Sequence, residues 1–331
     1  MSLRILARRL LGRKGVFILR RVLSKTALLL GVLKPSPRPN CVTAMICSFN
    51  DPDWVKPSIS TIADVVDEIV LVDSSTDNTP KLVVEEAQRH GVPVKLIRAP
   101  VGDLEEARNL GLRESTCRWI LVWDLDFIAR RELKKEITRL VETSDSRLGY
   151  LVYWPHINLC ATPLHVCRRE LHVEHWLYTW HPKARYVMAG VFEVLHAPLH
   201  AYKPIEIRKP LSLHLSYVRR PDRLAYKVIW WRYRSLFNSL ARRGATAEEL
   251  MEQAKKIALR DYGTSNLWEI GWKIAVNMAR KLEVYDEAKY GEYPIELLEH
   301  IARLDWCIKL LEETSVLETY KEMVKRYRNP K

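Results

Sequence analysis

From residue 42 onward, hydrophobic positions fall into two alternating patterns. Short apolar runs of strand length stand at 42–47, 68–72, 94–97 and 119–123. Between them, apolar residues recur at helical spacing over 54–66, 80–90 and 104–113. Strands that alternate with helices of about ten residues predict βαβ units and a mainly parallel sheet with flanking helices. The fold class we expect is therefore α/β.

The pattern changes twice more along the chain. Residues 150–217 are rich in Tyr, Trp, His and Pro, which indicates strands and loops, whereas the chain beyond Pro221 has helical spacing to its end. Thr246 and Glu249 have the spacing of a capping box, and Pro294 opens a helix predicted to run to residue 311. We expect a basic N-terminal segment and linker at 1–39, an α/β domain at 40–217 and a helical C-terminal region at 218–331.

The net charge of +13 lies almost entirely in the N-terminal segment. Residues 1–39 hold ten of the 53 basic residues and none of the 40 acidic ones, so the other 292 residues together carry +3. A basic excess favours an anionic partner such as nucleic acid, anionic lipid or a phosphorylated substrate. Because the basic excess lies in this one segment, we expect the segment, and not the folded body, to bind such a partner.

Apolar residues of the N-terminal segment also fall on two neighbouring helical faces. One face holds Leu3, Leu6, Leu10 and Phe17, and the other holds Ile18, Val22 and Leu29. Basic and apolar residues together suit a helix that lies on an anionic membrane surface. A disordered tail, or a basic tail packed on the core, explains the same composition, and both interpretations stay open here.

Membrane topology and cysteine usage indicate in which cellular compartment the protein resides. The longest uncharged run of the N-terminal segment is residues 26–33, far shorter than the roughly 20 residues that cross a bilayer. No signal-peptide order of charge, apolar run and cleavage site is present. The six cysteines are scattered without a C-x-x-C pair, which indicates reduced thiols. We expect a cytoplasmic protein, soluble or peripheral on the inner face of the membrane.

Polar side chains follow the predicted strands at their carboxyl ends, where ligands bind in parallel α/β sheets. Asp124 and Asp126 come directly after the fourth strand, two residues apart, so both carboxylates project to one side. Two oxygen ligands suit Mg2+ or Mn2+ bridging to a diphosphate, although a lone D-x-D is more often a solvated turn. Asp73 ends the second strand and could accept from a base or a ribose hydroxyl, or simply cap a turn.

Four segments together resemble a known family. Residues 42–50, 72–79, 107–111 and 122–126 occur in the order and spacing of family-2 glycosyltransferases of the GT-A fold, and the resemblance covers about 40–135. It implies that 40–217 is a GT-A catalytic domain and that the enzyme is an inverting, hexosyltransferase-type glycosyltransferase. Such an enzyme moves a sugar from a nucleotide-sugar to an acceptor hydroxyl and needs a divalent cation, Mn2+ or Mg2+.

The same resemblance implies roles for individual residues of the first half. Ser48, Asn50 and Asp73 would line the nucleoside pocket, and Arg108 would lie close to the nucleotide. Asp124 would face the ribose and the metal, with Asp126 as a direct metal ligand.

The second half resembles the family more loosely. Residues 186–193 look like the family segment whose Glu lies near the acceptor, which makes Glu193 the candidate base, although Phe192 replaces the usual His before it. A Glu in a surface strand would give the same sequence. His214, between two leucines, resembles a metal ligand or diphosphate contact with an arginine or Lys227 beside it, and a core histidine is the equal alternative.

The acceptor is the least determined partner. The acceptor could be lipid-linked or a glycan. Aromatic and imidazole side chains near the sugar site could form the surface that binds it, or could simply belong to the core. These residues are Trp154, His156, His175, Trp176 and Trp180. The competing functions are a catalytically inactive GT-A scaffold and a basic protein that binds nucleic acid or membrane. No nucleic-acid recognition module is present, so we expect no nucleic-acid partner.

Overall fold

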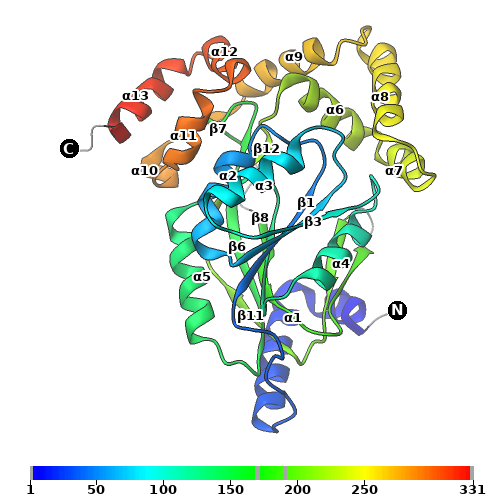
Figure 1. Ribbon diagram of the computed structural model, residues 1–331, viewed down its shortest axis with the longest axis vertical. Coiled ribbons are helices and arrows are strands. Elements are labelled where there is room, and N and C mark those ends of the chain that lie inside the picture. The colour runs from blue at the N-terminus through cyan, green and yellow to red at the C-terminus, as the bar shows by residue number, and fades with distance from the viewer. Residues whose placement is uncertain (1–2, 168–171, 190–191, 329–331) are drawn as a thin grey trace.

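The computed structural model describes residues 3–167, 172–189 and 192–328, and its centre is one large sheet (Figure 1). The strand order is β13-β7-β6-β8-β4-β1-β2-β3, with β11 and β12 also paired to β6 and β5 paired to β12. The strands of this sheet are β1 Val42–Ser48, β2 Glu68–Asp73, β3 Val94–Arg98, β4 Trp119–Trp123, β5 Phe127–Ala129, β6 Gly149–Cys160, β7 His165–Val166, β8 His172–Thr179, β11 Tyr202–Glu206, β12 Ser212–Tyr217 and β13 Glu283–Val284.

The parallel part of the sheet is the one that the apolar runs predicted. Strands β3, β2, β1 and β4 lie side by side and all run parallel. Ser48 pairs with Asp73, and Ile46 pairs with Trp123, so the carboxyl ends of three strands lie at the same level. The polar residues that follow these strands are therefore brought to one edge of the sheet.

Beyond β4 the sheet becomes mixed. Strand β8 is antiparallel to both β4 and β6, because no helix connects β6 to β8, while β11 and β12 run parallel to β6. A separate hairpin of β9 (Arg185–Ala189) and β10 (Phe192–His196) carries the predicted acceptor segment. The α/β class is confirmed, with its parallel strands concentrated in the N-terminal half of the domain.

Helices cover both faces of the parallel strands. Alternate residues of β1 point to opposite faces, so Ala44 and Ile46 join the core under one set of helices while Met45 joins the core on the other side. The first set is α2 (Val55–Ile62), α3 (Thr79–Arg89) and α5 (Arg131–Thr143), and the second side holds α4 (Leu104–Glu114). Burial on both faces explains why these strands read as continuous apolar runs.

A glycine lets α4 approach the sheet closely. A Cβ added to Gly111 would lie 2.7 Å from the side chain of Met45, well inside van der Waals contact. Arg108 lies one turn earlier on the same face of α4 and is buried. The close approach at Gly111 therefore places Arg108 beside the ends of β1 and β4.

The C-terminal region is helical, as predicted, and packs on the domain before it. Its helices are α6 Pro221–Arg232, α7 Arg234–Arg242, α8 Ala247–Tyr262, α9 Leu267–Ala279, α10 Glu287–Tyr290, α11 Ile295–Ile301, α12 Asp305–Glu313 and α13 Leu317–Arg328. The capping box at Thr246 is confirmed. One hydrophobic core joins Trp54 and Leu213 of the domain to Leu297 and Leu310 of these helices, so no separate core begins at residue 218.

The single helix predicted over 294–311 is wrong. The chain forms α11 and α12 with a break at 302–304. The break allows Leu298 and Leu310 to be buried in the same core from two helix directions, and Asp305 then sits in the first turn of α12, where an acidic side chain is favourable. Helical periodicity alone did not reveal this change of direction.

The N-terminal segment forms helix α1 (Leu3–Leu29), whose backbone is interrupted at Gly12 with a φ of +63°. One face of α1 lies on the domain. The guanidinium of Arg20 is buried and donates to the carbonyl oxygens of Ala197 and Pro198, and the ring of Phe17 lies 4.7 Å from that of Tyr153. The segment is therefore attached to the α/β domain along this face, as one of the two interpretations expected.

The expectation of reduced thiols is wrong for four of the six cysteines. Disulfides join Cys41 to Cys117 and Cys160 to Cys167. Cys41 and Cys117 are 76 residues apart, yet they precede the neighbouring parallel strands β1 and β4, whose first residues pair. Sequence spacing could not reveal a pairing that the sheet order creates. No helix in the described part of the chain is long and apolar enough to cross a membrane.

Candidate active site

A cavity of about 590 Å³ lies where β1 and β4 end, and residues of helices α6 and α7 also line it. Figure 1 shows where these two helices lie relative to the sheet. Most of the residues that the sequence nominated line this one cavity, although they come from six separate elements or loops. They are Ser48, Asn50, Arg108, Asp124, Asp126, Glu193 and His214.

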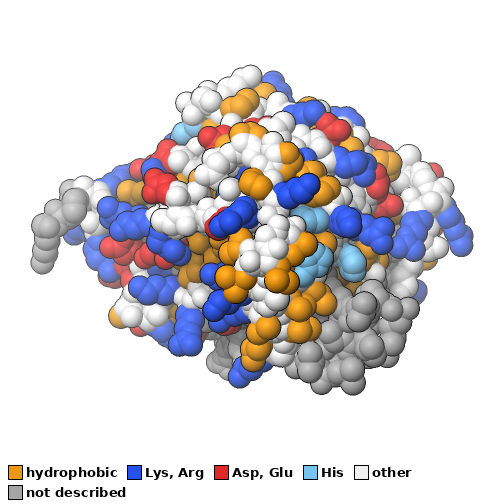
Figure 2. Space-filling model, turned by 90° about the horizontal axis from the view of Figure 1, so that it is seen from below, with side chains coloured by type: hydrophobic (Ala, Val, Ile, Leu, Met, Phe, Trp, Pro, Cys, Tyr) orange, Lys and Arg blue, Asp and Glu red, His pale blue; other side chains and the backbone are white. Residues whose placement is uncertain are grey.

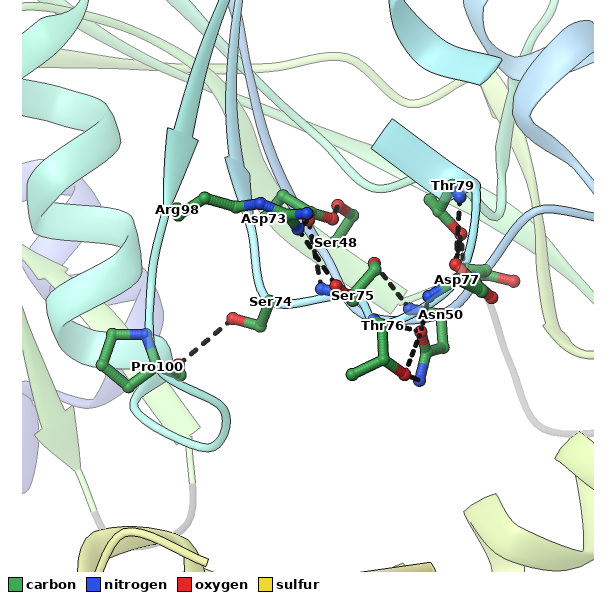
Figure 3. A network of polar contacts seen from close by, with 11 residues as sticks. Ser48, Asn50, Asp73, Ser74, Ser75, Thr76, Asp77, Thr79, Arg98 and Pro100 are labelled. Atoms are coloured by element: carbon green, nitrogen blue, oxygen red, sulfur yellow. Dashed lines mark hydrogen bonds and ion pairs between the residues drawn. The ribbon is translucent and has the colours of Figure 1, made fainter. Parts of the chain in front are cut away.

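A polar network ties the ends of β1 and β2 together (Figure 3). The side-chain oxygen of Asn50 accepts from the backbone N–H groups of Thr76 and Asp77, at 2.8 and 3.2 Å, and its own backbone N–H donates to Ser75 Oγ. Asn50 adopts a left-handed φ of +50°, a conformation that Asn tolerates better than most residues. The loop after β1 is thereby fixed against the loop after β2.

Asp73 lies behind the cavity wall and is completely buried. Its carboxylate accepts from Ser48 Oγ at 2.5 Å and from the backbone N–H of Ser75 at 3.1 Å, and it forms an ion pair with Arg98 (Figure 3). Asp73 thus fixes Ser48, which does line the cavity, and its own oxygens are occupied by protein donors.

Arg108 connects the two carboxylates predicted for donor and acceptor chemistry. Its Nη2 donates to Asp124 Oδ1 at 2.7 Å, and its Nε lies 3.7 Å from Glu193 Oε1. Burial alone would lower the pKa of the guanidinium, but the neighbouring Asp124 and Glu193 outweigh it and raise the pKa well above its ordinary value. Arg108 is therefore a permanently charged group held between these two carboxylates.

The guanidinium of Arg108 also has unused donors. Its side chain is 5% exposed, and neither Nε nor Nη1 forms a hydrogen bond with the described residues, although both atoms are buried. A buried, charged N–H without an acceptor is costly, so such groups commonly face a ligand. Because Arg108 lines the cavity, these donors are suited to an anionic or oxygen-rich ligand inside it.

Asp126 is surrounded by cations. Its Oδ2 accepts from Arg219 Nη2 at 2.6 Å and lies 3.8 Å from Lys227 Nζ, and Arg219 also pairs with Asp51 at 2.7 Å. Burial would raise the pKa of Asp126, but His214, Arg219 and Lys227 hold it well below its usual range. Burial and the adjacent Arg219 lower the pKa of Lys227 to about 8.

His214 lines the cavity and faces Asp126. Its ring stacks on Phe127 at 4.4 Å, and its Nδ1 lies 3.0 Å from Asn158 Oδ1. An amide oxygen can only accept, so Nδ1 donates and Nε2 is left facing Asp126 Oδ2 at 3.5 Å. A neutral imidazole would then aim a lone pair at a carboxylate, an arrangement that needs a proton or a cation between them.

These residues fit a divalent cation. Two ligand atoms that each lie about 2.1 Å from one ion can be up to about 4 Å apart. His214 Nε2 and Asp126 Oδ2 lie 3.5 Å apart, so one ion could bind both. The ligand atoms of Asp124, Asp126 and His214 do not all lie within 4.8 Å of one another in the described structure, so these three residues do not form a preformed metal site. Arg219 contacts the same oxygen of Asp126, so an ion there would have to share that oxygen or displace Arg219.

Comparison with known families agrees with this geometry. Residues 43–172 match the family model of glycosyl transferase family 2. The resemblance that the four segments carried is thereby confirmed, and the match reaches beyond them to include β6 and β7. No curated protein matches the chain in sequence.

Solved structures of glycosyltransferases are also similar over most of their length. One is the mannosyltransferase PcManGT from Pyrobaculum calidifontis in complex with GDP-Man and Mn2+, with 15% identity, 94% of this chain and 98% of that chain covered, and a TM-score of 0.38. Another is S. aureus TarS 1–349 in complex with UDP-GlcNAc, with 14% identity, 87% and 91% covered, and a TM-score of 0.39.

Among the side chains expected at the acceptor surface that the structure describes, one lines the cavity. Trp176 does so, whereas Trp154 and His156 are buried in the core. Trp180 lies outside the cavity, with the guanidinium of Arg38 3.9 Å from its ring. The side chain of His175 lies outside the described residues. Along β6 and β8 every second side chain points into the core, and composition alone did not show which side chains these are.

The cavity contains residues that the sequence did not nominate. Arg234, Asn238 and Arg242 of α7 line its outer end together with Trp230 and Trp231. Their spacing of four residues within a helix was a detectable signal of a shared face. What the sequence could not show is that this face of α7 lies opposite Glu193.

Proposed function

We propose that this protein is an inverting, hexosyltransferase-type glycosyltransferase that uses a nucleotide-sugar and Mn2+ or Mg2+ to glycosylate an acceptor hydroxyl. The observation that carries the proposal is the position of Arg108. It is a buried cation with unused donors, placed between Asp124 and Glu193 in a cavity at the strand ends. The family match to residues 43–172 supports the same reaction class.

On the donor side, Ser48 and Asn50 would contact the nucleoside, and Asp73 would position Ser48. Arg108 and Lys227 would face the diphosphate, since both are cations on the cavity wall, Arg108 buried and Lys227 partly buried. Asp126 and His214 would hold the divalent cation, with Asp124 on its ribose side. The cation, when bound, would stabilise the negative charge that develops on the departing diphosphate.

On the acceptor side, Glu193 would act as the base. Inversion in one step requires a carboxylate that accepts the proton of the acceptor hydroxyl while its oxygen attacks C1 and the bond from C1 to the diphosphate breaks. Glu193 lines the cavity and is partly exposed, so an acceptor could reach it. Arg108 at 3.7 Å orients the carboxylate.

A donor screen tests this function directly. Thermal unfolding would be followed with UDP-, GDP- and dTDP-sugars, each with and without Mn2+ and Mg2+, because a ligand that binds the folded state raises its melting temperature. We expect a metal-dependent shift with at least one donor, and its loss in Asp126→Ala. No shift with any donor, or an undiminished shift in the variant, would refute the donor site. Binding without sugar transfer to any acceptor would favour the inactive scaffold.

We further propose that α1 attaches the enzyme to an anionic membrane surface. The face of α1 opposite the docked one is apolar and exposed, with Ile18 64%, Val22 56% and Leu29 78% exposed. Exposed basic residues, including Arg21 and Lys25, flank this apolar face. Figure 2 views this end of the molecule and shows hydrophobic side chains gathered beside basic ones. Such a combination suits an interfacial helix.

Vesicle flotation tests the membrane proposal. We expect the full chain to bind vesicles of phosphatidylglycerol and phosphatidylcholine, and to lose most of that binding when Ile18, Val22 and Leu29 are replaced by Ser. The matched control is Leu259→Ser, because Leu259 is 58% exposed on α8. Equal binding of the triple variant and the wild type would refute attachment through this face.

A further inference from the structure

Arg219 bridges two carboxylates of the cavity wall. Its Nη1 lies 2.7 Å from Asp51 Oδ2, its Nη2 donates to Asp126 Oδ2 at 2.6 Å, and its side chain is 15% exposed. All three residues line the cavity, with Asp51 in the loop after β1 and Asp126 between β4 and β5. One guanidinium therefore joins the loop beside the proposed nucleoside site to the carboxylate proposed to hold the divalent cation.

This guanidinium is a firmly held cation. Burial alone would lower the pKa of Arg219, but Asp51 and Asp126 outweigh burial and raise the pKa above its ordinary value. The Nε of Arg219 also donates to the carbonyl oxygen of Ser216 at 3.4 Å. Each nitrogen of the planar fork thus has its own partner, a geometry that the single ammonium of a lysine does not reproduce.

A divalent cation on Asp126 would compete with Arg219. The oxygen that lies 3.5 Å from His214 Nε2 is Asp126 Oδ2, the same oxygen that Arg219 contacts. An ion about 2.1 Å from this oxygen would lie within about 4.7 Å of Arg219 Nη2, whatever its direction. Lys227 Nζ lies 3.8 Å from the same oxygen. Like charges this close repel, so contact of the ion with Oδ2 weakens the contact of Arg219.

Arg219 keeps other partners if it releases Asp126. Asp51 is fixed in its loop, because its backbone N–H donates to Thr79 Oγ1 at 3.0 Å. Asp53 is also close enough to interact electrostatically with Arg219. A diphosphate in the cavity would add acceptor oxygens for the freed Nη2. The guanidinium can therefore lose one carboxylate oxygen without losing all of its compensating charge.

We propose that Arg219 is a positioning residue that keeps the divalent cation off Asp126 until a nucleotide diphosphate enters the cavity. Without the diphosphate, the ion would leave the buried Nη2 of Arg219 without an acceptor, which is costly. With it, phosphate oxygens accept from Nη2 and their charge compensates the ion. Metal and nucleotide then strengthen each other's binding by the same factor. The inference rests on the proposed function, which assigns both the cation and the nucleotide to this cavity.

The test measures Mn2+ binding from the EPR signal of free Mn2+, first with the protein alone and then with UDP or GDP. Only binding that Asp126→Asn removes is assigned to this site. The wild type is compared with Arg219→Gln, which removes both the charge and the fork, and with Arg219→Lys, which keeps the charge alone. Arg220→Gln is the matched control, because Arg220 pairs with Asp222 and lies outside the lining of the cavity.

We expect the wild type to bind Mn2+ about tenfold more tightly, or better, when UDP or GDP is present. In Arg219→Gln, Mn2+ binding to the protein alone should tighten by about fivefold or more, so that the nucleotide adds less. Arg219→Lys should show a smaller gain in the same direction, and it decides the question if circular dichroism shows that Arg219→Gln is unfolded. Arg220→Gln should behave as the wild type does.

Three results would overturn this role. They are unchanged or weaker Mn2+ binding by Arg219→Gln alone, an equal gain in Arg220→Gln, and wild-type Mn2+ binding that UDP and GDP leave unchanged although they bind. If Arg219→Gln instead lost only nucleotide affinity, Arg219 would be a ligand of the diphosphate. A wild type that binds no nucleotide would refute the donor site, whereas a gain of Mn2+ binding in Arg219→Gln would still show that Arg219 competes with the cation.

Discussion

The two ends of the cavity differ in how their charges are arranged. At the donor end, Asp126 is enclosed by Arg219 and Lys227, and Asp124 by Arg108, so each carboxylate already has a cationic partner. At the α7 end, Arg234 lies against Trp231 and Arg242 is exposed. A pre-paired end needs little reorganisation when it binds a ligand, whereas an exposed side chain such as Arg242 loses conformational freedom when a ligand binds it.

The difference follows from which elements build each end. The donor end is made by the termini of buried strands and by loops held by the Asn50 and Asp73 networks. The α7 end is made by a nine-residue helix and a two-stranded hairpin outside that sheet. We infer that substitutions at the donor end act through pre-organised charge, and those at the α7 end through ligand contacts.

The largest effect is expected at Asp126. In Asp126→Asn the carboxylate charge is lost while Arg219 and Lys227 remain buried beside it. We expect sugar release from the nucleotide-sugar, measured as initial rate with Mn2+, to fall by about 10³-fold, because both metal binding and the charge balance are damaged. Asp64→Asn is the control, since Asp64 pairs with Lys134 on the surface. An unchanged rate would remove Asp126 from the donor end.

Glu193→Gln tests whether the two ends act separately. Transfer to an acceptor is expected to fall by about 10²–10⁴-fold, the usual contribution of a general base, while donor affinity measured by calorimetry stays within threefold of the wild type. Arg108 keeps its hydrogen bond to Asp124 in this variant, so the donor end retains its main ion pair. A parallel loss of donor affinity would instead place Glu193 at the donor end, as a support for Arg108.

Gly111→Ala tests the pre-organisation of the donor end through packing. The added Cβ would meet Met45, and the helix that carries Arg108 would have to move. We expect the free energy of unfolding in urea to fall by about 1–3 kcal/mol, a typical overpacking cost, together with weaker nucleotide binding. Arg113→Ala on the exposed side of α4 is expected to change stability by less than about 0.5 kcal/mol. Unchanged stability of Gly111→Ala would show that α4 is not held so closely.

The smallest effect is expected for His165, a buried neutral group that contrasts with the charged donor end. Burial lowers the pKa of His165 to about 4, and its Nδ1 hydrogen-bonds Thr162. Between pH 6.5 and 4 the unfolded chain binds a proton at this residue that the folded chain does not, so stability falls as the pH falls. Relative to His165→Gln, the wild type is expected to lose about 1–3 kcal/mol of unfolding free energy between pH 7 and 4, measured in urea.

A constant difference between the two proteins across this range would contradict that assignment. Because its neighbouring cations hold the pKa of Asp126 well below the usual range, this carboxylate is expected to stay ionised throughout. Nucleotide binding should then persist at pH values where the overall stability has already declined. The pH series therefore compares a charge-paired region with a group that is stable only when neutral.

The sequence predicted the parallel strands and the gathering of most nominated polar residues in one cavity, because both depend on local pattern. The apolar runs at β1, β2 and β4 are within a residue of their observed bounds, and the polar residues after them must meet at one sheet edge. Asp73 shows the limit of that reasoning. Its position at a strand end was correct, but its carboxylate is occupied by Arg98 and Ser48, a contact that depends on the register of three strands.

By itself, then, the sequence determined the α/β class, the resemblance to a family and the cluster of polar residues at the carboxyl ends of the strands. These follow from hydrophobic periodicity and motif spacing, which act over a few residues. Tertiary structure alone decided the disulfide between Cys41 and Cys117, the exposed face of α1 and the placement of α7 opposite Glu193. Each joins or separates segments far apart in the chain, and only packing against a common core fixes which of their faces meet.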